Sequence, residues 1–422
     1  MPRKLVTGEY DLRCTAVSRP GQTRNRLAAA MTEREISIGL LWHSDRSGNL
    51  GVGALTVGNI ALVRAVAAEL GIVPTFVIMG FDDNRRSYIH DADIRFSPLG
   101  LSTAAKFAAG VGRMDCILDI GGGDSFTDIY PFKRYAWIVA SKIVAIGQRV
   151  PLVFAPQTIG PFLGETLAKR TLNRLARWSM RRARAVVVRD ARSAETVRAL
   201  VPGVEPVYAV DVAFALTWTP PQRSPGAPRV GINVSGLLWN GGHTGKGEFK
   251  LGYDYQALMT GLIESLLARG DVTIELICHV NGETGSNEDD GNVADTLAAR
   301  YPALIRVPDF ASPSAAKSHI AGMDALVAAR MHACIAAFSS GVPVVPVSYS
   351  RKFEGLFGSL GYDRLVPFTG MGTDAALAFI LAALDQRAIL ATEIAAGLTQ
   401  VEARLDAYRS VLRTLFCSLG KG

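Results

Sequence analysis

The sequence is poor in cysteine, and its cysteines follow no pattern. The 422 residues include five, spread along the whole chain: Cys14, Cys116, Cys278, Cys334 and Cys417. An odd number at wide spacing excludes a disulfide framework, and no CxxC or Cys/His spacing suits a zinc site. We therefore expect a reduced, cytoplasmic protein without a structural metal.

Long hydrophobic runs are missing as well. No apolar stretch approaches the roughly 18–20 residues that a membrane-spanning helix needs. The first 30 residues are polar and basic and hold no apolar signal core, so we expect no export. Any contact with a membrane is then expected to be peripheral, at its inner face.

Acidic residues are scarce in one segment of a chain whose net charge is 45 − 38 = +7. From Lys169 to Arg198 there are ten basic residues and two acidic ones. Four arginines step by 4, 3 and 4 and so share one helix face: Arg170, Arg174, Arg177 and Arg181. This face is either a solvated surface or a contact for anionic lipid headgroups or a diphosphate carrier. Nucleic acid is disfavoured, because no binding motif or aromatic interleaving accompanies the charge.

What the chain does have is enough apolar sequence for large cores, with 49% hydrophobic and 20% charged residues. Short apolar runs alternate with helical patterns, which predicts an α/β fold with parallel sheets. The length favours two domains. The proline-rich stretch TWTPPQRSPGAP predicts a linker between them. The predicted division is an extension (1–35), an N-terminal domain (36–216), the linker (217–228), a C-terminal domain (229–372) and a helical tail (373–422).

Each half predicts a Rossmann-like, doubly wound domain. In the first half we expect strands at 36–42, 72–79, 115–120, 151–155, 184–189 and 206–210, with a helix over about 54–70. In the second half we expect strands at 229–236 and 272–280, then near LIRV, DALVA and VPVVPVSY. Ligands of such sheets bind beyond the carboxyl ends of the strands, so the expected site is a cleft where the two domains face one another.

Arg330 and His332 stand where a buried strand gives way to a helix, in the stretch AARMHACIAAFSSGVP. A helix N-terminus favours an anion, and a guanidinium adds a planar fork for phosphate or carboxylate. An imidazole exchanges a proton near neutral pH. An anionic substrate with a proton-transfer step accounts for both residues. The alternative is a surface arginine beside a capping histidine.

Other basic side chains end neighbouring strands. Arg351 and Lys352 follow the strand VPVVPVSY, and one of them is a candidate to complete an anion pocket, unless both belong to a solvated loop. Arg189 ends the strand VVVR before Asp190. Arg189 is either a cleft residue or a surface arginine beside an ordinary helix start at Asp190. His279 and His43 also end strands, as cleft residues or as packed histidines.

Two glycine-rich loops follow strands of the first half. In DIGGGDSFTD, three glycines permit close approach of a ligand, or else serve a tight turn; the residues singled out there are Gly121, Gly122, Gly123, Asp124 and Ser125. The loop GNLGVGAL, which includes Asn49, is similar and does not have the spacing of a dinucleotide fingerprint. The acidic turn NEDDG (287–291) is either a divalent-ion site or, as is usual, solvated.

With these residues in view, the chain resembles the polysaccharide pyruvyl transferases over about residues 36–365. Four segments carry the likeness: His43 to Gly53, Asp119 to Asp124, Val187 to Ser193, and the block DALVAARMHACIAAFSSGVPVVPVSYSRKFEGLF (324–357). The last is the most specific, because Arg-x-His, GVP and Y-x-x-K occur together. Val52 departs from the family pattern, in which an Asp often follows the glycine.

The resemblance implies a fold like that of the two-domain GT-B glycosyltransferases, with the acceptor on the N-terminal domain and the donor on the C-terminal domain. It implies phosphoenolpyruvate as donor, no cofactor or metal, and a pyruvate ketal on a sugar of a surface polysaccharide or its polyprenyl-diphosphate-linked precursor as product. Arg330 and His332 then serve donor binding and catalysis, with Arg189 and Lys352 as further donor contacts.

Two other functions remain open from sequence. A GT-B glycosyltransferase would use a nucleotide-sugar donor, and fold alone does not separate it from a pyruvyl transferase. A non-catalytic scaffold would dock on membranes through the face of Arg170, Arg174, Arg177 and Arg181.

Overall fold

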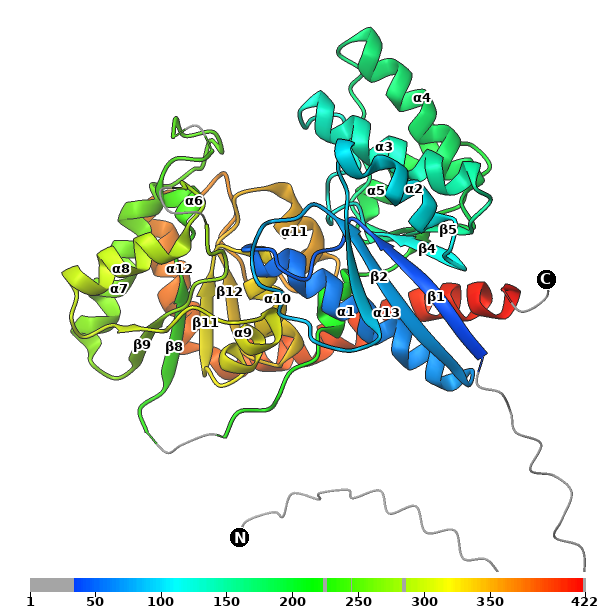
Figure 1. Cartoon of the computed structure of the whole chain (residues 1–422). Coiled ribbons are helices and arrows are strands. Elements are labelled where there is room, and N and C mark those ends of the chain that lie inside the picture. The colour runs from blue at the N-terminus through cyan, green and yellow to red at the C-terminus, as the bar shows by residue number, and fades with distance from the viewer. Residues whose placement is uncertain (1–33, 223–225, 244, 283–285, 420–422) are drawn as a thin grey trace, which may run out of the picture.

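The computed structural model describes residues 34–222, 226–243, 245–282 and 286–419. The extension expected over residues 1–35 lies outside the described residues except for its last two, which open the first strand. Part of the expected linker, residues 223–225, also lies outside them. Two parallel sheets lie side by side, each covered by helices (Figure 1).

The N-terminal sheet has seven parallel strands in the order β3-β2-β1-β4-β5-β6-β7. The strands are β1 (Arg34–Leu41), β2 (Ile72–Gly80), β3 (Ile94–Pro98), β4 (Cys116–Asp119), β5 (Leu152–Gln157), β6 (Ala185–Val188) and β7 (Val207–Tyr208). The central strands β4, β5 and β6 are apolar runs buried on both faces, as parallel strands between helix layers must be. The sequence predicts six of these strands but not β3, because IRFSP holds no continuous apolar run.

Helices connect these strands on both faces of the sheet. They are α1 (Leu50–Glu69), α2 (Ala104–Val111), α3 (Phe132–Gly147), α4 (Leu167–Arg182) and α5 (Ala191–Leu200), with short 3-10 helices η1 (Leu101–Thr103) and η2 (Val212–Ala215). Side chains cap several N-termini: Thr166 accepts from Lys169 N–H in α4, and Asp190 accepts from Ser193 N–H in α5.

The C-terminal sheet has five parallel strands in the order β10-β9-β8-β11-β12. The strands are β8 (Arg229–Asn233), β9 (Thr273–Leu276), β10 (Ile305–Arg306), β11 (Ala325–Ala328) and β12 (Val344–Pro346). Its helices are α6 (Gly236–Trp239), α7 (Tyr255–Arg269), α8 (Asp290–Arg300), α9 (Pro313–Ile320), α10 (Met331–Ser339) and α11 (Arg351–Gly358). In each sheet, the chain adds strands first on one side and then on the other side of the first strand, β1 or β8. Such sheets form ligand sites where this order changes.

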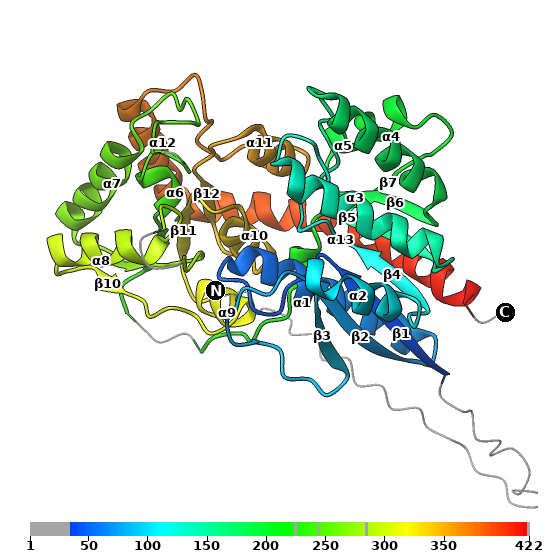
Figure 2. The same ribbon diagram turned by 45° about the horizontal axis from the view of Figure 1, so that its top comes forward.

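The tail after the second sheet forms two helices, α12 (Thr373–Asp385) and α13 (Arg387–Ser418). The long α13 runs back under the N-terminal domain, as both views show (Figures 1 and 2). There Arg413 pairs with Glu69 of α1, and Arg34 of β1 donates to the Phe416 carbonyl. The tail therefore joins the two domains.

The expectation that no apolar stretch is long enough to span a membrane is wrong. Within the described residues, α1 has the length and hydropathy of a span, with a mean hydropathy of 1.7 in its most apolar window. The pair α12–α13 meets the same criteria when counted together, although the two helices bend by 84°. However, 72% of the α1 window is buried inside the protein. Because α1 packs against η2, α9, α10 and α13, its apolar surface serves the protein core.

A buried chain of hydrogen bonds ties α13 to the first strand. The Tyr408 hydroxyl donates to Asn59 Oδ1 at 2.9 Å, and Asn59 Nδ2 donates to His43 Nε2 at 2.9 Å. His43 Nδ1 in turn donates to the Leu41 carbonyl at 3.1 Å. Each polar group is thereby satisfied away from water.

We expect Tyr408→Phe to lower the free energy of unfolding by about 1–3 kcal/mol, because it leaves Asn59 Oδ1 buried without a donor. Urea denaturation measures this change. Thr414→Ala, at an exposed position of the same helix, is the matched control and should change little. Equal stability of the two variants would contradict the structural role of this chain of hydrogen bonds.

Candidate active site at the domain boundary

The carboxyl edges of the two sheets meet at the start of α1. Leu50 N–H donates to the His279 carbonyl at 3.1 Å, and Asn281 N–H donates to the Gly48 carbonyl at 2.9 Å. Asn49 forms an antiparallel bridge with Val280 and caps α1 by accepting from Gly51 N–H at 3.0 Å. Asn49, predicted as a substrate residue, therefore helps to fix the two domains against one another.

Arg330 is the N-cap residue of α10, and its guanidinium is buried. Its Nε and Nη2 donate to Asp290 Oδ1 at 3.1 and 2.8 Å, and Nη2 also donates to the Glu288 carbonyl at 2.5 Å. Among the described residues, Nη1 has no hydrogen-bond partner. The fork expected to hold an anion is thus largely occupied by a carboxylate of its own domain, with one edge remaining.

Asp290 is a buried anchor that the sequence analysis did not identify. Besides Arg330, its carboxylate accepts from Asn233 Nδ2 and from the backbone N–H groups of Gly236, His279 and Val280 at 2.9–3.1 Å. It therefore holds the ends of β8 and β9 next to α10. The turn NEDDG, considered above as an ion site, uses this aspartate for structure, while Asp289 caps α8.

His332 lies in the first turn of α10 and faces the N-terminal domain. A Cβ on Gly51 would overlap the imidazole Nδ1, so the ring lies directly against the start of α1. Its Nε2 is buried, lacks a hydrogen-bond partner among the described residues, and lies 3.7 Å from Asp211 Oδ2. A buried ring nitrogen without a partner is rare, and it marks a place where a substrate atom can bind.

Asp211 is a further residue that the sequence analysis missed. It follows β7, is fully buried, and its Oδ2 accepts from Arg189 Nη1. Burial alone would raise the pKa of this carboxyl, but Arg189 and His332 outweigh it and hold the pKa well below its ordinary value. Asp211 is therefore a carboxylate aimed at His332. Its signal in the sequence was a lone aspartate within the apolar run AVDVAFA.

Arg189 directly follows β6, at the edge of the sheet where it was predicted. Besides Asp211, it donates from Nε to Thr158 Oγ1 at 3.1 Å. Its Nη2 has no hydrogen-bond partner among the described residues and lies close to Gly123, where an added Cβ would be 3.9 Å from it. One edge of this guanidinium is therefore turned toward the glycine loop.

Lys352 crosses the domain boundary. Its Nζ is 2.6 Å from Asp124 Oδ2, and Tyr130 also donates to that oxygen at 3.1 Å. Burial alone would raise the pKa of Asp124, but Lys352, Arg189 and Arg134 outweigh it and lower the pKa. Of the two adjacent candidates in α11, Lys352 thus reaches the site. Arg351 is exposed, with no ion pair among the described residues.

The glycine loop after β4 makes a turn and also lines the site. Gly121, Gly122 and Gly123 have φ values of +54°, +60° and +89°, which side chains rarely adopt. A Cβ on Gly121 would overlap Gln157 Oε1, and one on Gly123 would meet Leu55 at 2.8 Å. The geometry of the loop therefore needs glycine, and its backbone lies near Arg189; close approach of a ligand stays a prediction.

Two of the candidate histidines are deeply buried. Both ring nitrogens of His43 are hydrogen-bonded, and burial lowers its pKa to about 3. The pKa of His279 is also lowered to about 3, first by burial and then by His332 and Arg330. Both rings are therefore neutral at physiological pH, although His43 also lines the cavity described next.

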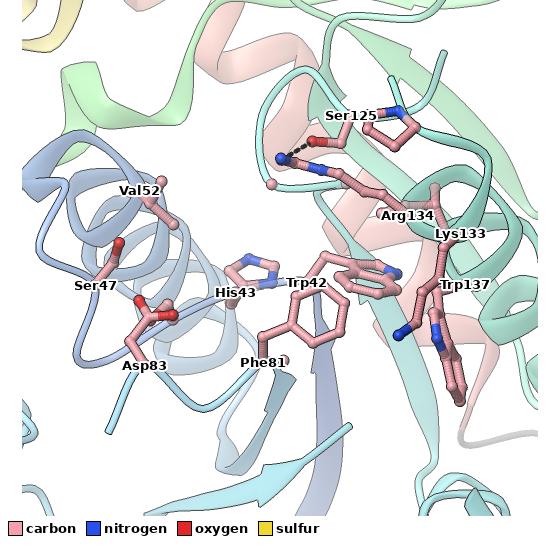
Figure 3. Close-up of a pocket in the computed structure, with 16 residues that line it drawn as sticks. Trp42, His43, Ser47, Val52, Phe81, Asp83, Ser125, Lys133, Arg134 and Trp137 are labelled. Atoms are coloured by element: carbon pink, nitrogen blue, oxygen red, sulfur yellow. Dashed lines mark hydrogen bonds between the residues drawn. The ribbon is translucent and has the colours of Figure 1, made fainter. Parts of the chain in front are cut away.

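A cavity of about 550 Å³ opens on the N-terminal domain beside the glycine loop. Gly121, Gly122 and Ser125 form part of its wall, and Arg134 reaches Ser125 Oγ at 2.5 Å (Figure 3). Aromatic and basic side chains also line it, from α3 and from the positions just after β1 and β2: Trp42, Phe81, Lys133, Arg134 and Trp137. The volume suits a small ligand or a sugar unit. No local sequence motif predicts these residues as part of a site.

The charges at the boundary nearly cancel. Three cations, Arg189, Arg330 and Lys352, are each paired with a carboxylate, and these carboxylates are Asp211, Asp290 and Asp124. An anionic ligand can use donor edges that the carboxylates leave open. Within the described residues, no group of three or more His, Cys, Asp or Glu side chains is arranged to hold a metal ion.

Solved structures share this architecture. The UDP-GlcNAc 2-epimerase of Neisseria meningitidis bound to UDP-GlcNAc is 9% identical, with a TM-score of 0.52 over 87% of this chain and 99% of that one. The corresponding epimerase of Methanocaldococcus jannaschii is 9% identical, with a TM-score of 0.52 over 83% and 93%. The glycotransferase of kitacinnamycin is 13% identical, with a TM-score of 0.50 over 92% and 99%. These likenesses confirm the GT-B-like fold with two parallel-sheet domains.

A search of curated proteins by sequence found no significant match. A family model for polysaccharide pyruvyl transferase, in contrast, matches residues 57–351, which is most of the chain. The matched region includes the glycine loop, Arg189, Arg330 and His332. The chain therefore belongs to the polysaccharide pyruvyl transferase family, as the resemblance predicted.

Proposed function

We propose that this transferase moves the pyruvyl group of phosphoenolpyruvate onto two hydroxyls of one sugar, forming a ketal and releasing phosphate. The observation that carries the proposal is the Nε2 of His332, which is buried at the domain boundary and has no hydrogen-bond partner among the described residues. It lies 3.7 Å from Asp211 Oδ2, the oxygen that also accepts from Arg189. A proton-transfer group beside open cationic edges suits a donor that is both anionic and activated by protonation.

The reaction balances without a cofactor. A proton adds to the methylene carbon of phosphoenolpyruvate, which makes C2 electrophilic, and a sugar hydroxyl forms a bond to C2. The C2–O bond to phosphate then breaks, and the second hydroxyl closes the ketal. Two hydroxyl protons are released from the sugar. One balances the proton that forms the new methyl group, and the other leaves with phosphate.

His332 is the proposed general acid. Its Nε2 is the ring atom that carries the transferred proton, and Asp211, 3.7 Å away, stabilises the imidazolium form by its negative charge. The start of α1 at Gly51 packs against the ring and limits its rotation. Asp211 therefore acts as a positioning residue that links the two domains at the reacting centre.

The donor's phosphate and carboxylate need several cations. We assign these contacts to the open edges of Arg189 and Arg330 and to Lys352, which can exchange its bond with Asp124 for one with the donor. The acceptor sugar belongs in the cavity beside the glycine loop, where Trp42, Phe81 and Trp137 offer apolar faces. The acceptor is free or polyprenyl-diphosphate-linked, and the proposed compartment is the cytoplasm.

The proposal is tested by incubating the full chain with phosphoenolpyruvate and a lipid-linked oligosaccharide, followed by mass spectrometry. A product heavier by one pyruvate ketal, formed together with inorganic phosphate, is expected. A parallel reaction supplies UDP-GlcNAc in place of phosphoenolpyruvate. Transfer of a sugar in that reaction, with no pyruvylated product in the first, would replace the proposal with the glycosyltransferase alternative.

We expect His332→Ala to lower turnover by about 10²–10⁴, the usual contribution of a general acid. Release of phosphate in the presence of acceptor measures the rate. His90→Ala, which removes an exposed histidine, is the control and should retain full turnover. Turnover of His332→Ala within a few-fold of the unmodified chain would reject the assignment.

Lys352→Gln is expected to raise the KM for phosphoenolpyruvate about tenfold or more, because a hydrogen bond to a charged group contributes about 1.5–3 kcal/mol. Stability should change little, since the Lys352 side chain is 43% exposed. Arg351→Gln is the matched control at the neighbouring residue. A larger rise in KM for Arg351→Gln than for Lys352→Gln would show that the donor contact is misassigned.

A further inference from the structure

Exposed hydrophobic side chains gather on one face of the N-terminal domain. Ten large hydrophobic residues are exposed in the described part of the chain, and six of them belong to α4 or to the segments that lead into α3 and α4. Single exposed hydrophobic residues are ordinary, but a cluster marks an interaction site. The six are Ile129, Phe132, Leu163, Leu167, Leu175 and Trp178.

Hydrogen bonds hold the two loops of this cluster together. Asp128, which is buried, accepts from Leu163 N–H at 2.7 Å, from Gly164 N–H at 2.6 Å and from Asn173 Nδ2 at 2.9 Å. Thr127 Oγ1 donates to the Pro161 carbonyl at 2.5 Å. Ile129 is therefore fixed beside Leu163, with its side chain 51% exposed. The apolar tips are presented by an ordered scaffold.

The exposed face of α4 continues the cluster with mixed chemistry. Leu167, Arg174 and Trp178 are spaced by 7 and 4 residues and so lie on one face of the helix. Leu167 is 77% exposed, and Arg182 lies 5.8 Å from the Trp178 ring. Of the four arginines predicted to share a face, Arg177 is half-buried and the other three are exposed.

The charge of this face has one sign. From Leu167 to Arg182, α4 holds six basic residues and no acidic one. The acidic residue just before it, Glu165, is paired with Lys169 at 3.0 Å. Arg174 and Arg181 form no ion pair with any described residue. The face is therefore complementary to an anionic surface.

We propose that this face, named here the α4 surface, docks on a membrane that carries anionic headgroups. The α4 surface consists of six exposed hydrophobic residues and four arginines: Ile129, Phe132, Leu163, Leu167, Leu175 and Trp178, with Arg170, Arg174, Arg181 and Arg182. Leucine, phenylalanine and tryptophan side chains enter the boundary between headgroups and acyl chains, while arginines bind lipid phosphates. α4 lies at the outer end of the N-terminal domain, away from the C-terminal domain (Figures 1 and 2). Docking there leaves the domain boundary open to solvent.

Two features favour a lipid surface over an acidic protein. On α4 the apolar Leu167 and Trp178 share one helix face with Arg174, so apolar and cationic groups are mixed within the cluster, which suits insertion among headgroups. The α4 surface also adjoins the aromatic cavity, since Pro131 and Lys133, on either side of Phe132, line that cavity. Access of a lipid-linked acceptor to the cavity rests on the proposed function. The docking itself does not.

The test is co-sedimentation of the full chain with vesicles of phosphatidylcholine, with and without phosphatidylglycerol, in the absence of any substrate. We expect binding to the anionic vesicles that weakens as salt rises, and much weaker binding to phosphatidylcholine alone. The double variant Leu163→Asp/Leu167→Asp should bind at least about tenfold more weakly, because it replaces two apolar insertions with charges. Arg174→Glu/Arg181→Glu should lose binding to anionic vesicles in particular.

Ile305→Asp/Ile389→Asp is the matched control, because these residues are 47% and 49% exposed and lie outside the α4 surface, in β10 and α13. It should bind vesicles like the unmodified chain. Undiminished binding by the leucine variant, or no preference for anionic vesicles, overturns the proposal. Binding of soluble heparin but not of vesicles also overturns it, in favour of an acidic macromolecular partner. Because no donor or acceptor is present, these outcomes are independent of pyruvyl transfer.

Discussion

The site depends on ion pairs that are withdrawn from water at the ends of parallel strands. Arg330–Asp290 and Arg189–Asp211 are both buried, and each carboxylate also accepts backbone N–H bonds. Removing one member of such a pair leaves an uncompensated buried charge and costs about 3–5 kcal/mol. The pairs therefore fix the cations in position before a substrate arrives, which is what electrostatic preorganisation requires.

The same arrangement explains why the domains form one site. His332 comes from the second domain and Asp211 from the segment after the last strand of the first. A second pair also joins the domains, because Lys352 of the second domain binds Asp124 of the first. Because α1 packs against both α10 and α13, and α13 is tied to Asn59 by Tyr408, the start of α1 is held firmly where it meets the imidazole.

Much of the architecture could be predicted from the sequence. Parallel strands buried on both faces are short apolar runs, and residues that end such runs must lie at one edge of the sheet. That reasoning placed Arg189, Arg330 and His332 at the boundary, and the resemblance to the family was confirmed. It failed for β3, whose residues are exposed or only half-buried. It placed the helix α1 over about 54–70, but the apolar length of this helix was underestimated.

The partners of the predicted residues could not be read from the sequence. Asp211 lies 22 residues from Arg189, and Asp290 lies 40 residues from Arg330. No local sequence pattern predicts pairs at such separations. The aromatic cavity brings together Trp42, which follows β1, Phe81, which follows β2, and Trp137 of α3. The pairing of the Arg330 guanidinium with Asp290 is such a long-range contact, and the sequence did not predict it.

The central claim is that the cations at the domain boundary bind a small donor with two anionic groups. Saturation-transfer NMR on the full chain, with phosphoenolpyruvate and UDP-GlcNAc present together, tests it most directly. We expect saturation of the phosphoenolpyruvate methylene protons, which is lost when Arg189 is replaced by Gln. Saturation of the UDP-GlcNAc protons alone, unchanged by that replacement, would contradict it.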